Sequence, residues 1–136
     1  QDYPEKDSKA AIQLQQIFYR MTKYFIENFN TANFLTEALY HSKAASYFTN
    51  YRVQHFIFVR TLIEQAQREG DICSDMNSYE IYTTLQSILI QPIIIKNNIL
   101  QQHKNEPLMD KLKLIDVSSE SSLQKRLRVA FKGLRP

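Results

Sequence analysis

This 136-residue chain has few residues that end helices and strands or form disulfides: it contains two Gly, four Pro and one Cys. It also has no Trp. So little turn material argues against a fold of many short strands and for long helices with few connections. The single cysteine, Cys73, excludes a disulfide framework and is typical of a reducing compartment. The sequence therefore predicts an all-α protein that is stabilised by its core alone.

Long hydrophobic runs and leader signals are missing as well. The most apolar stretch, ILIQPIII, is interrupted by Gln91 and Pro92 and is far shorter than the roughly 20 residues that span a bilayer. The chain does not start with a positively charged segment followed by an apolar one, as a secretory signal would. Its length suits one domain with a single core. We expect one domain over residues 1–136, located in the cytoplasm and away from membranes.

Motifs for catalysis and cofactors are also lacking. The sequence contains no CxxC, HExxH, GxSxG or Gly-rich phosphate loop. The three histidines, His41, His55 and His103, stand far apart in the chain, without a metal-binding neighbour at helical spacing. Asp71 and Asp75 flank Cys73 and disfavour its reactive thiolate. The sequence therefore predicts no enzyme, no cofactor and no metal site.

Charge is modest and unevenly placed. The net charge is +3, and residues 104–136 hold eight Lys/Arg against four Asp/Glu. A basic segment of this kind is one feature of nucleic-acid binding. A solvated helix face is the more common role for such charges, and we prefer that interpretation.

What the sequence has instead is helical periodicity. Apolar residues recur at spacings of three and four, as in Leu14, Phe18, Met21 and Phe25. The pattern predicts five long helices. The first starts at about Pro4 or Ser8 and ends at Phe29, and the others cover about residues 32–48, 53–69, 78–102 and 119–133. Short joints are expected at 30–31 and 49–52. A longer polar connection, partly helical from Pro107, is expected before the last helix, with Ser118 or Ser119 as its N-cap.

One of the two glycines marks a corner in the stretch AQREGDICSDMN. Gly70 follows an apolar-periodic segment, and glycine is the residue that most easily adopts the left-handed conformation after a helix. Asn77 and Glu80 have the spacing of a capping box that opens the next helix. We therefore expect a tight corner between two helices at 70–77.

The helix predicted over 78–102 is apolar on several sides. One apolar stripe of this helix contains Ile81, Leu85 and Ile88. A second stripe, about 100° away around the helix, contains Tyr82, Gln86 and Leu89. A helix that is apolar all round is buried all round. In a chain of this size, this predicts that one side faces the core and another faces a partner. Pro92 lacks a backbone N–H and should kink the helix.

Aromatic residues are concentrated in the first half of the chain. Twelve of the sixteen Phe and Tyr lie between Phe18 and Phe58. Such stripes usually build a solid core, and the alternative is a cavity between helices with a few polar groups that orient a ligand. The sequence leaves both open. If there is a pocket, its candidate residues are Phe18, Met21, Phe25, Phe48, His55, Phe56, Val59, Tyr82, Gln86 and Leu89.

The stretch FVRTLIEQAQREGDICSDMNSYEIYTTLQSILIQPIII resembles the regulatory half of tetracycline-repressor (TetR) family transcriptional regulators. The closing LQKRLRVAFKGLRP is similar to the final helix of that family. The family's helix-turn-helix DNA-binding half has no counterpart here. The resemblance thus implies an antiparallel helical bundle of the TetR regulatory-domain type, whose pocket takes a small, largely apolar or aromatic ligand.

The resemblance further implies a homodimer that releases DNA when the complete protein binds its ligand. The two helices at 78–102 and 119–133 would pair with those of a second copy. The interface residues expected on this basis are Ile88, Pro92, Ile95, Leu123, Leu127 and Ala130. Two alternatives are a ligand-free all-α module for protein–protein interaction and, with less support, an all-α enzyme.

Overall fold

The computed structural model describes residues 9–28, 42–103 and 106–136, and for 42–52 it describes the backbone alone. These residues form helices and no strands, which confirms the all-α prediction. The helices are α1 (Lys9–Glu27), α3 (Ser42–Arg68), α4 (Ser78–Leu89), α5 (Gln91–Gln102), α6 (Leu108–Leu114) and α7 (Glu120–Gly133). None of these helices is both long enough and apolar enough to cross a membrane.

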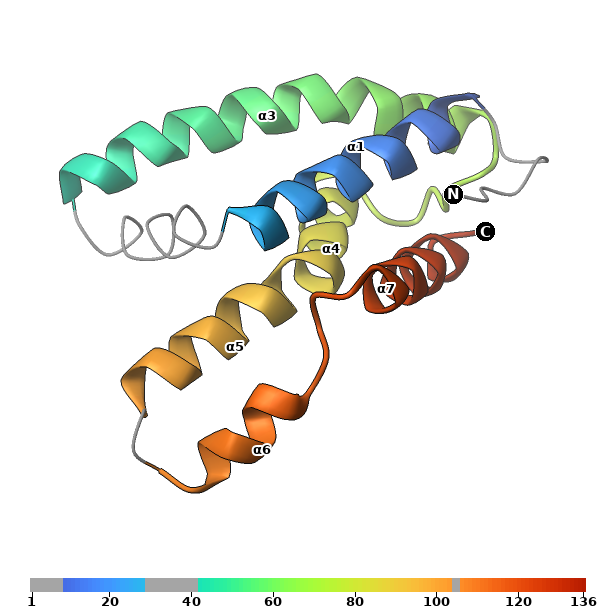
Figure 1. Ribbon diagram of the computed structural model, residues 1–136. Coiled ribbons are helices and arrows are strands. Elements are labelled where there is room, and N and C mark those ends of the chain that lie inside the picture. Colours follow the sequence, from blue (N-terminus) through green and yellow to red (C-terminus); the bar gives the residue numbers. More distant parts are fainter. Residues whose placement is uncertain (1–8, 29–41, 104–105) are drawn as a thin grey trace.

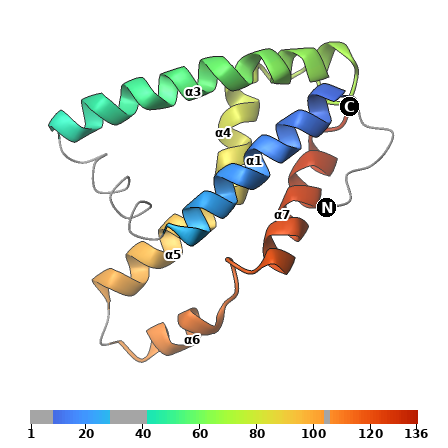
Figure 2. The same cartoon turned by 45° about the horizontal axis from the view of Figure 1, so that its top comes forward.

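The core lies where four of the helices meet. α1 and α3 run side by side in opposite directions (Figures 1 and 2). α4 packs against both of them, and α7 packs against α1 and α4. Each helix contributes fully buried side chains, because its apolar residues recur at the helical period. Examples are Leu14 and Phe18 on α1, Ile63 on α3, Leu85 on α4 and Leu123 on α7.

α3 differs from the sequence prediction, because it runs unbroken from Ser42 to Arg68. The joint that we expected at 49–52 is therefore wrong, and residues 42–48 of the helix predicted before it continue without a break into the helix predicted after it. Residues 32–41 of the first predicted helix lie outside the described residues. Polar residues such as Thr49 and Asn50 lower helix propensity only slightly, and no Gly or Pro interrupts the segment. The joint predicted at 30–31 lies outside the described residues.

The expected kink at Pro92 is a break between α4 and α5. α4 ends at Leu89, and Pro92 lies in the first turn of α5, where its missing N–H costs least. The helix axis changes direction at this point (Figure 1). A proline therefore ends one helix and opens the next, as its chemistry predicts.

The corner after α3 is built as the sequence predicted. Gly70 has φ +84, the only positive φ among the described residues. Its N–H donates to Gln67 O at 3.1 Å and that of Asp71 to Ala66 O at 3.0 Å, the two bonds of a Schellman cap. At the next helix, the Asn77 side chain and Glu80 form the expected capping box.

Three further hydrogen bonds hold this corner in place. The Gln67 amide donates to the carbonyls of Cys73 and Met76 at 3.0 and 2.8 Å. The N–H of Cys73 donates to Leu134 O at 2.7 Å. The corner is thereby joined to the end of α7, far away in the sequence.

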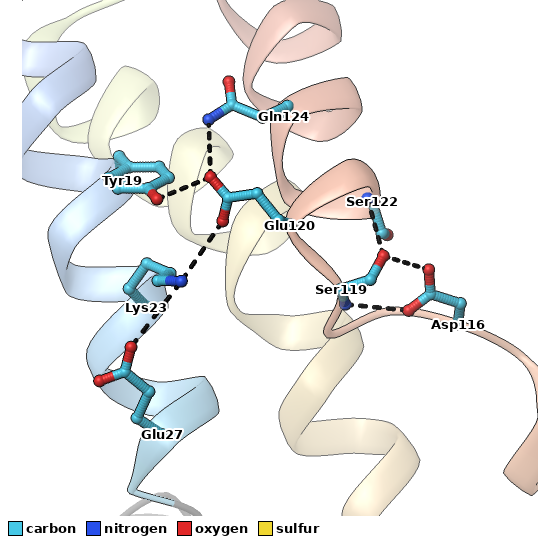
Figure 3. A network of polar contacts seen from close by, with 8 residues as sticks. All are labelled: Tyr19, Lys23, Glu27, Asp116, Ser119, Glu120, Ser122 and Gln124. Atoms are coloured by element: carbon cyan, nitrogen blue, oxygen red, sulfur yellow. Dashed lines mark hydrogen bonds and ion pairs between the residues drawn. The ribbon is translucent and has the colours of Figure 1, made fainter. Parts of the chain in front are cut away.

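A polar network on the surface joins α1 to the start of α7 (Figure 3). Glu120 accepts from the Tyr19 hydroxyl at 2.7 Å and from Lys23 Nζ at 3.4 Å. Ser119 caps α7 by accepting from the N–H of Ser122, which confirms one of its two predicted N-caps. These contacts orient α7 along α1 and leave its apolar stripe facing the core.

α5 and α6 project from the core as a pair, which we call the arm (residues 91–103 and 106–114). In both views the arm lies away from α3 (Figures 1 and 2). Its helices pack on each other, and α5 joins the core through the end of α4. The helix predicted from Pro107 is confirmed as α6, with Pro107 as its N-cap.

Candidate functional site

A polar cluster joins α3 and α4 at one end of the core. His55 belongs to α3, and Tyr82 and Gln86 belong to the neighbouring helix α4. Tyr82 and Gln86 are four residues apart, so they lie on the same face of α4. The Tyr82 hydroxyl is 2.6 Å from His55 Nδ1 and accepts from Gln86 Nε2 at 3.1 Å. We call these three residues the His55 cluster.

Aromatic rings surround the His55 cluster. Phe18 and Phe56 meet the Tyr82 ring edge to face, with ring centroids 6.1 and 5.3 Å away. Tyr79 contacts Phe56 in turn, with centroids 5.6 Å apart. The hydroxyl, amide and imidazole groups are therefore held in apolar surroundings, where a hydrogen bond is electrostatically stronger than in water.

Burial lowers the pKa of His55 below its ordinary value, because the apolar surroundings disfavour the charged imidazolium. His55 is therefore neutral at pH 7, with one donor and one acceptor nitrogen. Since Gln86 donates to the phenol oxygen, the phenol proton is available for His55 Nδ1. If the phenol donates to Nδ1, the imidazole proton lies on Nε2.

Most of the candidate pocket residues do lie near one another. Phe18, Tyr82, Phe56 and His55 are in direct contact, and Gln86 joins them through Tyr82. Met21, Phe25 and Phe56 are partly buried against the core, whereas Val59 and Leu89 are fully inside it. The side chain of Phe48 lies outside the described residues.

Part of this region is solid core. Phe18, Val59 and Leu89 have no exposed surface, and Tyr82 is almost completely buried. The more open residues, His55, Phe56 and Gln86, lie at its rim. In the described part of the chain, the two best-defined grooves are elsewhere, one between α5 and α6 and one between α1 and α3.

The groove between α5 and α6 was not predicted from the sequence. It encloses about 280 Å³ and is lined by Ser87, Gln91, Pro92, Ile95, Lys96, Ile99, Leu112, Ile115 and Val117. Ile95 and Ile115 remain about half exposed there, and Leu114 on the same arm is 86% exposed. The signal for it was the apolar stripe that begins with Ile81, Leu85 and Ile88, because this stripe continues into Pro92, Ile95 and Ile99 of the groove. The position of α6 had no signature in the sequence.

The groove between α1 and α3 is more polar. It is lined by Gln13, Gln16, Ile17, Arg20, Phe58, Thr61 and Leu62 and encloses about 500 Å³. Phe58 is 65% exposed at its edge. Its polar lining comes from Gln13, Gln16, Arg20 and Thr61.

The six expected interface residues fall into two sets. Leu123, Leu127 and Ala130 are buried in the chain's own core, where their stripe packs against α1 and α4. Ile88 is partly buried against the core, Pro92 is half-buried and Ile95 is 51% exposed. Only the second set is at the surface, so a partner would meet α5 rather than the apolar stripe of α7.

Groups that bind metals or act as nucleophiles are not assembled. No three His, Cys, Asp or Glu side chains within the described residues come close enough to hold a metal ion. Burial and the neighbouring Asp75 raise the pKa of the Cys73 thiol, which keeps it protonated. Among the described residues, the His55 cluster brings together hydrogen-bonding side chains from two helices.

Comparisons with known proteins give no relative. No family model, no curated protein and no solved structure matches this chain.

Proposed function

We propose that this chain is the ligand-sensing and dimerisation part of a transcriptional regulator similar to the TetR family. The single observation that carries the proposal is the His55 cluster, three hydrogen-bonding side chains held among aromatic rings between α3 and α4. Apolar walls with a few convergent polar groups are typical of small-molecule sites. The rings would supply affinity, and His55 and Gln86 would orient one polar end of the ligand.

The ligand class follows from this chemistry. A neutral imidazole and a carboxamide both offer donors and acceptors without a charge. They suit a largely apolar or aromatic molecule with one carbonyl or hydroxyl group. A strongly charged ligand would find no compensating charge in the cluster and would lose its hydration.

Sensing requires that the ligand prefers one of two arrangements of the helices. In the proposed regulator, ligand contacts at α4 would alter the relation between two copies and so the spacing of the attached DNA-binding domains. The coupling is reciprocal, so DNA would weaken ligand binding by the same factor.

A thermal-shift screen tests the proposal. Small aromatic and aliphatic compounds with one carbonyl or hydroxyl group are added to the parent, to Gln86→Leu and to Gln101→Leu, an exposed glutamine on α5. A compound at about 100 times its Kd stabilises the folded parent by about 2.7 kcal/mol. We expect the parent and Gln101→Leu to shift equally and Gln86→Leu to shift less. Equal shifts in all three, or none in the parent, would contradict the proposal.

A ligand-free interaction module is the second candidate, and the apolar groove of the arm favours it. Ile95, Leu114 and Ile115 expose apolar surface around that groove. Exposed apolar patches of this kind mark interaction sites between proteins. Under this alternative the His55 cluster is purely structural, and no compound raises the unfolding midpoint.

A further inference from the structure

The carbonyl of Leu89 loses its helical partner at the break between α4 and α5. In a continuous helix, Leu89 O would accept from the N–H of Ile93. Here the N–H groups of Ile93 and Ile94 both donate to Ile90 O, at 3.0 and 3.3 Å. The last carbonyl of α4 therefore needs a donor from another part of the chain.

Arg126 on α7 supplies that donor. Its Nη2 donates to Leu89 O at 3.0 Å, across 37 residues of sequence, and its Nη1 donates to Ser122 Oγ at 2.7 Å. Burial lowers the pKa of this guanidinium, opposed by the charge of Asp116. Its buried Nε has no partner among the described residues. Burial deprives the Arg126 guanidinium of part of its hydration. Its hydrogen bond satisfies the carbonyl of Leu89 at the break between α4 and α5.

The arm beyond the break behaves as one piece. Lys96 Nζ on α5 donates to the carbonyls of Lys113 and Ile115, which belong to the end of α6. Met109 on α6 and Ile93 on α5 are both buried within this outer part of the molecule. These contacts hold α5 and α6 together. The arm meets the core at Ile90, through Ile94, which packs against the core, and through residues 115–119.

We propose that Ile90 is a hinge between the core and the arm, and that Arg126 is the positioning residue that latches it. Gln86 of the His55 cluster lies one helical turn before the hinge, so the latch and the cluster meet on α4. The proposal goes beyond ligand sensing, because the latch fixes the arm whether or not a ligand is bound. It assigns to α7 the control of the arm's orientation.

Spin-label distances test the latch in the ligand-free protein, independently of the proposed sensing role. Cys73→Ser removes the native thiol, and labels are placed at Leu114→Cys on the arm and Phe58→Cys on α3, both exposed. We expect a single narrow distance distribution in this parent. Arg126→Gln should broaden it or add a second distance, whereas Arg128→Gln, an exposed arginine on the same helix, should not.

Amide exchange gives a local readout. In Arg126→Gln we expect the N–H groups of Ile93 and Ile94 to exchange about tenfold faster, the factor expected from losing a hydrogen bond to a charged group. A merely structural role would lower the melting temperature and leave the distance distribution narrow, which would overturn the proposal.

If Arg126→Gln does not fold, Ser122→Ala takes its place. This milder variant removes the second anchor of the guanidinium. The latch predicts a smaller broadening in the same direction, and a distribution identical to that of the parent would overturn it.

Discussion

The Tyr82 hydroxyl is hydrogen-bonded to two side chains, one on α3 and one on α4. Its removal measures how much a single buried polar atom contributes to the free energy of unfolding. It meets His55 at 2.6 Å and Gln86 at 3.1 Å within an aromatic surrounding. Removing only the oxygen keeps the ring contacts with Phe18 and Phe56. The substitution therefore isolates hydrogen bonding from packing.

We predict that Tyr82→Phe lowers the free energy of unfolding by about 1–3 kcal/mol, because two polar groups lose a partner in a poorly solvated place. Tyr79→Phe is the matched control, since Tyr79 lies three residues earlier on α4 and is 60% exposed. Its effect should stay within about 0.5 kcal/mol. Urea unfolding of both variants makes the measurement, and equal effects would count against the cluster.

A second prediction for a single residue concerns the effect of His55 on the pH dependence of the free energy of unfolding. Its pKa is lowered in the folded chain, so the unfolded chain binds the proton more readily. The contribution of neutral His55 is fully present above the unfolded pKa of about 6.5 and is lost as the pH falls below it. We expect the free energy of unfolding to decline from about pH 7.5 to about pH 5 in the parent.

The variant His55→Gln should decline less over that range, because it has no imidazole to protonate. His103→Gln, which alters an exposed histidine at the end of α5, serves as the control and should follow the parent. Parallel pH profiles for the parent and His55→Gln would show that the burial of His55 does not affect stability.

At the scale of the elements, the two glycines end helices in different ways. Gly70 adopts φ +84, and nothing lies within 4 Å of a Cβ built there. Gly133, in the last turn of α7, also has open space but an ordinary helical conformation. A Cβ would not be crowded at either position, so a difference between alanine substitutions at Gly70 and Gly133 reports the backbone conformation rather than a steric clash.

We predict that Gly70→Ala destabilises the chain by about 1–2 kcal/mol, the cost of the left-handed conformation for a residue with a Cβ. Gly133→Ala should be neutral or stabilising by up to about 1 kcal/mol, because alanine has the higher helix propensity. Thermal unfolding of the two variants compares them directly. If Gly70→Ala were as stable as the parent, the Schellman cap would not depend on glycine.

At the scale of the whole molecule, the arm decides where a second copy would bind. The stripe of α7 is occupied by the chain's own core, so Leu127→Glu would unfold the protein and say nothing about dimers. Ile95 on α5 is 51% exposed and Ile57 on α3 is 52% exposed. The two isoleucines are equally exposed and lie on different helices, so Ile57 is a control for Ile95.

If α5 forms the dimer interface, Ile95→Glu should convert the dimer to a monomer with unchanged helicity, because the interface would bury an unpaired charge. Ile57→Glu should remain dimeric. Sedimentation of the parent and of both variants, with circular dichroism as the check of folding, makes the measurement. A parent that is monomeric at all concentrations would rule out the proposed homodimer.

Local chemistry explains what was predictable from the sequence. The periodic spacing of residues such as Leu14 and Phe18 predicted helices, because amphipathic spacing reports the face that is buried. Gly70, Asn77 and Ser119 predicted helix ends, because caps depend on a few adjacent residues. Pro92 predicted a kink in one helix over 78–102 for the same reason, and the structure has two helices there. The joint at 49–52 failed because a helix that gains tertiary contacts tolerates weak helix formers.

The sequence by itself determined the all-α class, the corner at Gly70 and a disturbance of the helix at Pro92, since each follows from bonds within a few residues. Only the tertiary structure decided that Tyr82 meets His55, that Leu127 faces inward and that Arg126 reaches Leu89 O. Periodicity shows that a helix has an apolar face, but it does not tell which neighbour covers that face. Such pairings depend on how whole helices pack, and packing optimises all faces together.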